Sequence, residues 1–100
     1  MYTQQEVIDK LIPLLMQYPI KRAALFGSYA RGDQTSDSDL DVYLELDDSA
    51  DIVSVYYDFW DELEDKVCLN ADVLTPGSLT TAPQRFRERI LSELMYIYEA

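Results

Sequence analysis

Two groups of residues near the middle of the sequence have the types and the spacing that bind phosphate and divalent cations. Gly27-Ser28 follows a short apolar segment, and Asp39 and Asp41 stand at the start of the next one. A glycine lets the backbone approach a ligand closely, and the N–H groups of a helical turn, together with the Ser28 hydroxyl, form a site for phosphate oxygens. Arg31, one turn further on, adds a fixed positive charge. We therefore expect a phosphate site at this turn.

Three aspartates are candidate metal ligands. Asp39 and Asp41 are two residues apart in a segment that alternates between apolar and polar side chains. Both carboxylates therefore project from one face of a strand, spaced roughly 7 Å along it. Carboxylates without His or Cys favour Mg²⁺ or Mn²⁺ over zinc. Asp72 would complete the cluster if its segment pairs beside that strand, and a bound cation would offset the mutual repulsion. A phosphate site beside such a cluster is the equipment for two-metal phosphoryl or nucleotidyl transfer.

Other interpretations of these residues remain open. Asp37 and Asp39 also form a pair at two-residue spacing, but the hydrophobic alternation begins only at Leu40, so we expect Asp37 in a loop. The Gly-Ser pair could be an ordinary turn, and Arg31 could simply balance neighbouring acids.

The surrounding sequence predicts the elements that would position these residues. A capping box, Thr3-Gln-Gln-Glu6, precedes apolar residues at helical spacing and predicts a helix over 4–17. We expect Pro13 to kink or divide this helix. The remaining pattern predicts strands over 20–26, 40–46, 71–75 and 95–98 and helices over 51–66 and 83–94, with Pro76-Gly77 closing the third strand. The length of 100 residues predicts a single domain over 1–100. Whether the strands on either side of the Gly27 turn run parallel or antiparallel is open.

The charge distribution excludes several kinds of partner. The chain has 19 acidic and 8 basic residues and a formal net charge of −11. Proteins that bind nucleic acid or anionic membranes need basic surfaces, so we expect neither as a direct partner. Fourteen of the acidic residues lie within 33–72, many of them on the outer faces of the predicted helix over 51–66. These faces are either simply solvated or a docking surface for a basic protein.

The absence of histidine excludes Ser-His-Asp and Cys-His catalysis and His-ligated zinc. The single cysteine, Cys68, cannot form an internal disulfide, which fits a reducing compartment. The N-terminal residues lack a signal-peptide pattern, and no apolar run approaches the length of a membrane span. We therefore expect a cytoplasmic protein.

The central segment resembles the nucleotidyltransferase superfamily that includes polymerase β. The hallmark of that superfamily is Gly-Ser, ten residues, then Asp-x-Asp, as in Gly27-Ser28, residues 29–38 and Asp39-Leu40-Asp41. The extended pattern Gly-Ser-x-Ala-Arg-Gly, ending in Ser-Asp-Leu-Asp, looks like that of the small MNT domains, which are antitoxin partners of HEPN toxins. The later segment Ala71 to Leu74 agrees with this resemblance.

The resemblance implies an α+β, polymerase β palm-like fold, with helices packed on a small mixed sheet. It also implies transfer of AMP from ATP with two Mg²⁺ ions, usually to a tyrosine hydroxyl of the cognate HEPN ribonuclease. Carried over by position, Gly27 and Ser28 would bind the β and γ phosphates, with Arg31 beside them. Asp39 and Asp41 would hold the two metal ions. Asp72 would hold the catalytic ion and help to deprotonate the acceptor.

Two alternative functions stay open from the sequence. The chain could be a non-catalytic antitoxin that masks the toxin by binding, or a nucleotidyltransferase that acts on a small-molecule acceptor.

Overall fold

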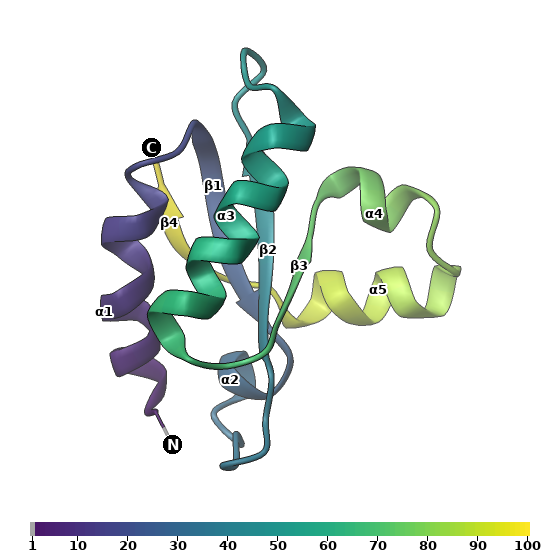
Figure 1. The fold of residues 1–100 in the computed structure, drawn as a ribbon. Helices are drawn as coiled ribbons and strands as arrows, with labels where there is room; N and C mark the ends of the chain where they lie inside the picture. The colour runs from purple at the N-terminus through teal and green to yellow at the C-terminus, as the bar shows by residue number, and fades with distance from the viewer. Residues whose placement is uncertain (1) are drawn as a thin grey trace.

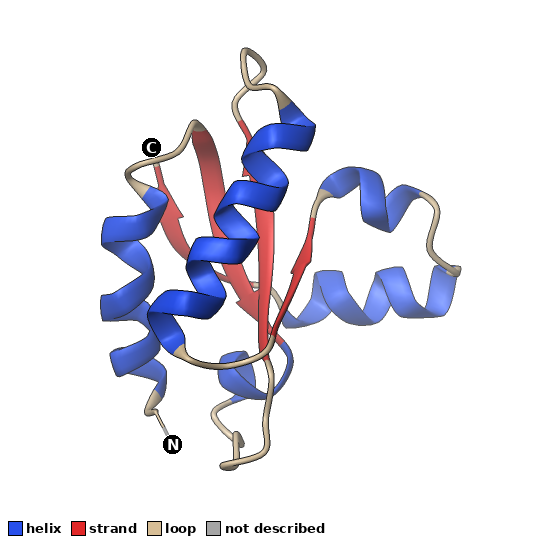
Figure 2. Cartoon of the chain, in the orientation of Figure 1, coloured by secondary structure: helices blue, strands red, loops and turns tan. Residues whose placement is uncertain are grey.

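Four strands form one mixed sheet with helices on both of its faces (Figures 1 and 2). The structure, a computed structural model, describes residues 2–100. Its elements are α1 (Gln4–Leu15), β1 (Ile20–Phe26), α2 (Gly27–Arg31), β2 (Leu40–Leu46), α3 (Ile52–Val67), β3 (Ala71–Leu74), α4 (Pro76–Thr80), α5 (Gln84–Glu93) and β4 (Met95–Glu99). The predicted α+β class with a mixed sheet is confirmed.

The strands lie in the order β3-β2-β1-β4. β1 is antiparallel to both β2 and β4, whereas β2 and β3 are parallel. The pairing of β1 with β2 answers the question that the sequence left open. Parallel neighbours need a crossover connection, and α3 provides it between β2 and β3. The pairing of β3 beside β2, on which the position of Asp72 depends, is thus present.

The larger part of the core lies between the sheet and the pair α1 and α3, which lie in front of it in Figure 1. Leu40, Val42 and Leu44 of β2 are fully buried on this face. The opposite face is covered by α4 and α5 and holds a smaller cluster, in which Tyr43 packs with Phe26 and other apolar residues. The predicted polar face of β2 is therefore apolar at its centre and carries its carboxylates only toward the ends of the strand.

Local signals set most helix boundaries. The Thr3 capping box is formed, and α1 continues through Pro13 without division but ends at Leu15, two residues earlier than predicted. In α3, Asp51 is the N-cap and accepts a hydrogen bond from the Ser54 N–H.

The strand ends just before Pro76-Gly77, as predicted, but these two residues begin α4, a helix that was not predicted from the sequence. The Thr75 side chain accepts a hydrogen bond from the Ser78 N–H, and the Ser78 hydroxyl accepts one from the Thr75 N–H. Proline suits the first helical position because its missing N–H has no partner there. The capping role of Thr75 also ends β3 at Leu74.

Within residues 2–100, no helix combines the length and the apolar character that crossing a membrane requires.

Replacement of Thr75 by alanine should destabilise the fold, because it removes the N-cap of α4. We expect Thr75→Ala to lower the free energy of unfolding by about 1 kcal/mol, measured by urea denaturation. Thr80→Ala on the same helix is the control, since the Thr80 hydroxyl only donates to the Pro76 carbonyl on the surface. Equal stability of the two variants would contradict the capping role.

Candidate active site

Gly27 brings the backbone directly against a carboxylate. β1 ends at Phe26, and the chain enters α2 at Gly27 with a φ of +71°. Residues with a side chain rarely adopt this left-handed conformation. A Cβ at this position would lie 2.2 Å from Oδ2 of Asp41, which is far inside van der Waals contact. The left-handed φ and the close approach of Asp41 therefore both favour glycine at this position.

The short helix α2 is held in place from two sides. The Tyr29 side chain is 1% exposed and anchors the turn in the main core. The Gln4 amide of α1 donates hydrogen bonds to the carbonyls of Tyr29 and Ala30, at 2.8 and 3.2 Å. Gly32 ends the helix in the left-handed conformation, with a φ of 81°. The predicted turn is thus a fixed structure that presents the Gly27 N–H and Ser28 at one end of the sheet.

Strand pairing brings two of the three candidate aspartates together. Asp41 is in register with Phe26 on one side and with Asp72 on the other. Register partners in neighbouring strands project from the same face, so Asp41 and Asp72 point the same way. Asp41 is partly buried, whereas Asp72 is exposed.

Asp41, Asp72 and Gly27 line one cavity of about 360 Å³, whose other wall is formed by α5 with Phe86 and Glu93 among its lining residues. Of the residues that the sequence predicted for the site, this cavity brings together Gly27, Asp41 and Asp72.

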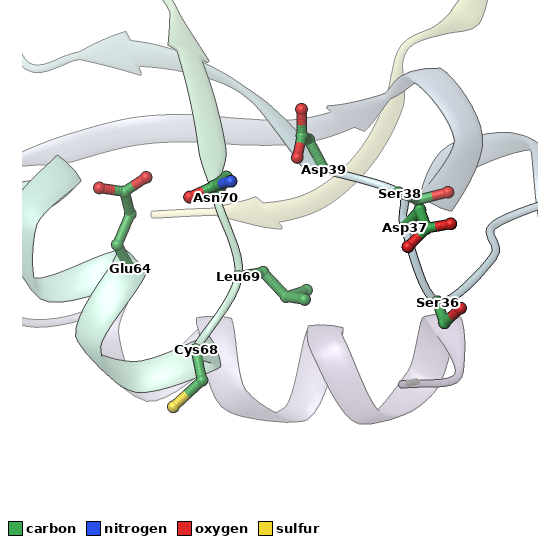
Figure 3. Close-up of a pocket in the computed structure, with 8 residues that line it drawn as sticks. All are labelled: Ser36, Asp37, Ser38, Asp39, Glu64, Cys68, Leu69 and Asn70. Carbon is green, nitrogen blue, oxygen red and sulfur yellow. The ribbon is translucent and has the colours of Figure 1, made fainter.

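Asp39 immediately precedes β2 and lines a neighbouring cavity of about 470 Å³ (Figure 3). Its side chain points away from that of Asp37, which lies in an exposed turn as predicted. Among residues 2–100, the side chains do not form a ready group of three or more acidic, Cys or His ligands. The structure therefore brings Asp41 and Asp72 into one cavity. Asp39, two residues before Asp41 in the sequence, lies in the wall of the second cavity.

The electrostatics of Asp41 favour a bound cation. Its pKa is raised to about 6, chiefly because burial disfavours the charged form and further because Asp72 and Asp39 are like charges nearby. Arg31 acts in the opposite direction. A divalent cation would offset both causes, and an all-oxygen donor set suits Mg²⁺. The oxygen donors of Asp41 and Asp72, which line one cavity, fit Mg²⁺, and these two residues would hold it. Asp39 as a further ligand stays a prediction from the sequence.

Arg31 lies at the site but is paired with acids, as one of the two interpretations of the sequence expected. Its Nη1 is 2.9 Å from Oε1 of Glu93, and its Nε is 3.2 Å from Oδ2 of Asp33. Both pairs raise the pKa of the guanidinium further above its usual range.

α5 contributes to the site, which was not predicted from the sequence. Phe86, Arg89 and Glu93 of this helix line the same cavity as Asp41. Their spacing of three and four residues places them on one helix face, which is a signal that the sequence did contain. The spacing does not indicate, however, which part of the sheet this face of α5 contacts.

The raised pKa of Asp41 predicts a pH-dependent stability. The folded protein holds this proton more tightly than the unfolded chain, so stability falls as the pH rises from about 4 to about 6. Asp41→Asn removes the penalty and should raise the free energy of unfolding at pH 7 by about 2 kcal/mol, allowing for solvent screening of a partly exposed group. Below pH 4 the gain should vanish. Urea denaturation with a chelator present measures it.

Asp37→Asn is the matched control because Asp37 lies in an exposed turn. The assignment would be contradicted if Asp41→Asn were no more stable than this control at pH 7.

Comparison with protein families gives a match over most of the chain. The model for the family "Polymerase beta, Nucleotidyltransferase" matches residues 9–100. Two curated relatives come from Methanocaldococcus jannaschii, and both are described as candidate protein adenylyltransferases. MJ0435 is 37% identical over 91 residues, which cover 88% of this chain and 90% of that protein. MJ1379 is 35% identical over 95 residues, which cover 93% of each.

Solved structures agree on the fold. A toxin–antitoxin structure with AMP-PNP matches with a TM-score of 0.71 at 21% identity, covering 93% of this chain and 73% of that one. A candidate minimal nucleotidyltransferase gives a TM-score of 0.71 at 22% identity and covers 94% and 95%. An MNT antitoxin complex with the tri-AMPylated HEPN toxin of Shewanella oneidensis gives 0.67 at 18% identity and covers 98% and 74%. The family model over residues 9–100 and the curated relatives at 35% and 37% identity show that the chain belongs to the polymerase β nucleotidyltransferase family.

Proposed function

We propose that the chain is an antitoxin that transfers AMP from ATP to a tyrosine hydroxyl of a cognate HEPN ribonuclease and so neutralises it. The observation that carries the proposal is the shared cavity of Gly27, Asp41 and Asp72, in which the Gly27 backbone lies close to the Asp41 carboxylate. We propose that this backbone binds phosphate and that this carboxylate binds the metal. The curated relatives are described as candidate protein adenylyltransferases, which supports a protein as acceptor. The toxin–antitoxin structures among the neighbours support the kind of partner.

In the proposed reaction the tyrosine oxygen attacks the α-phosphorus of ATP. The new oxygen–phosphorus bond forms as the bond from the α-phosphorus to the bridging oxygen breaks, and pyrophosphate leaves with that electron pair. The hydroxyl proton passes to the Asp72 carboxylate, which is exposed at the edge of the cavity. Two Mg²⁺ ions, when bound, neutralise the charge that develops on the phosphate oxygens. The Gly27 N–H and the Ser28 hydroxyl hold the β and γ phosphates, with Arg31 beside them.

The open side of the site favours an acceptor on a separate molecule. Among residues 2–100, the cavity walls come from the first three strands, α2 and α5, and Asp72 faces solvent. The net charge of −11 disfavours a nucleic acid acceptor. A protein that inserts a tyrosine beside Asp72 meets both conditions.

The outer face of α3 is our candidate for docking that partner. It carries four exposed acidic residues, Asp58, Asp61, Glu62 and Asp65. Complementary charge accelerates association, and salt screens it. The association rate with the toxin should therefore fall as ionic strength rises, measured by stopped-flow fluorescence. A rate that is indifferent to salt would argue for a merely solvated helix face.

The double variant Asp39→Ala/Asp41→Ala tests the catalytic proposal. With ATP, Mg²⁺ and the HEPN partner, the wild-type protein should increase the mass of the partner by one or more AMP groups on tyrosine. The double variant should abolish the increase, because it removes two of the three metal-binding carboxylates. Intact mass spectrometry with peptide mapping measures both.

The matched control is Asp37→Ala/Asp48→Ala, which removes two exposed turn carboxylates from the same chain. Modification that survives in the Asp39/Asp41 variant would refute the site. Neutralisation of the toxin by that variant without ATP would favour masking by binding. Labelled AMP on small molecules, with none on the partner, would favour the small-molecule acceptor.

A further inference from the structure

A carboxylate of the chain itself already occupies the groups that the proposed function assigns to phosphate. The Gly27 N–H donates a hydrogen bond to Oε2 of Glu93 at 3.2 Å, and Arg31 Nη1 lies 2.9 Å from Oε1 of the same side chain. Glu93 is the last residue of α5, and its side chain is only 17% exposed. One oxygen thus takes the backbone donor and the other takes the guanidinium, which is how two oxygens of a phosphate would be held.

The position of Glu93 is costly unless these donors compensate it. Its carboxylate lines the same cavity as those of Asp41 and Asp72, so three acidic groups face one small space. Like charges that share one small cavity repel each other, and partial burial strengthens the repulsion. The bonds to Gly27 and Arg31 therefore account for why Glu93 points inward.

Arg89 is a second cationic partner for the Glu93 carboxylate if that carboxylate moves away from Gly27 and Arg31. Arg89 lies one helical turn earlier on α5, with its Nε 3.6 Å from Glu93 Oε1 and its side chain 68% exposed. A change of the Glu93 side chain toward Arg89 keeps an ion pair and frees both donors of the α2 turn. Arg31 and Arg89 both contact Oε1 of Glu93, so the carboxylate can release Arg31 and still keep one cationic partner.

We propose that the Glu93 carboxylate occupies the phosphate site in the absence of nucleotide and is displaced by the triphosphate when nucleotide binds. The inference rests on the proposed function, because it requires that the α2 turn binds a nucleotide triphosphate. The more highly charged phosphate oxygens take over the Gly27 N–H and Arg31, and Glu93 retains Arg89. Since the protein must first release its own carboxylate, its apparent affinity for nucleotide is lower than that of an open site.

Glu93→Gln tests this competition. Glutamine keeps the shape and can still accept from the Gly27 N–H, but it forms no ion pair with Arg31. We expect it to tighten the binding of Mg-ATP and of inorganic tripolyphosphate by about tenfold, measured by isothermal titration calorimetry. Glu88→Gln is the control, because Glu88 lies on the same helix and accepts only from the exposed Gln84 side chain. Equal or weaker binding by folded Glu93→Gln, with the thermal unfolding midpoint unchanged, would overturn the inference.

The wild-type protein gives a second readout that does not depend on any variant. In a tripolyphosphate titration followed by NMR, the Gly27 amide signal and the Glu93 carboxyl carbon signal should move together and saturate at the same concentration. A Glu93 signal that stays constant while ligand saturates the protein would show that the carboxylate is not displaced.

The two proposals fail in different ways. If neither wild type nor Glu93→Gln binds Mg-ATP, the proposed function and the exchange both fall. If both bind it equally and the Glu93 signal is unmoved, only the exchange falls.

Discussion

The carboxylate of Asp41 lies against the Cα of Gly27, in register with Asp72, and is partly removed from water. It cannot ionise there without cost, which is why its pKa lies near 6. The antiparallel pairing of β1 and β2 places Asp41 beside the end of β1, next to Gly27. The parallel pairing of β2 and β3 places Asp72 on its other side. A fold that forces two acids together in this way is stabilised when a cation binds between them, and a cation is what phosphate chemistry needs at that point.

The larger core lies on one face of the sheet, and the candidate site lies on the other. One face carries α1 and α3 over the larger cluster of buried residues, including Phe59 and Leu63 of α3. The other carries α4 and α5 over a smaller cluster and leaves room for a cavity at the end of β1. The charged groups therefore gather where the apolar packing is thinnest, and the main core can hold the strands that position them.

The features that the sequence predicted well are those that depend on near neighbours. The glycine turn and the strand over 40–46 are local, and the structure has them at the predicted residues. The position of Asp72 was conditional, because strand order depends on contacts between distant segments. Glu93 was out of reach, since its hydrogen bond to Gly27 spans 66 residues and no local pattern encodes it. The α4 helix was missed for another reason: Pro76-Gly77 was interpreted only as the end of the preceding strand, although Thr75 and Ser78 form a capping box there.

The connection between Glu93 and the sheet is short. Glu93 ends α5, Met95 begins β4 two residues later, and Met95 pairs with Leu25, which is two residues before Gly27. The carboxylate and the amide that it occupies are thus held together by the edge of the sheet. Glu93 is in effect an intramolecular ligand, and its effective concentration at the turn is set by this geometry. Dilution of the protein leaves this effective concentration unchanged. In the proposed exchange, the nucleotide concentration that displaces Glu93 is therefore a property of the chain and is independent of the protein concentration.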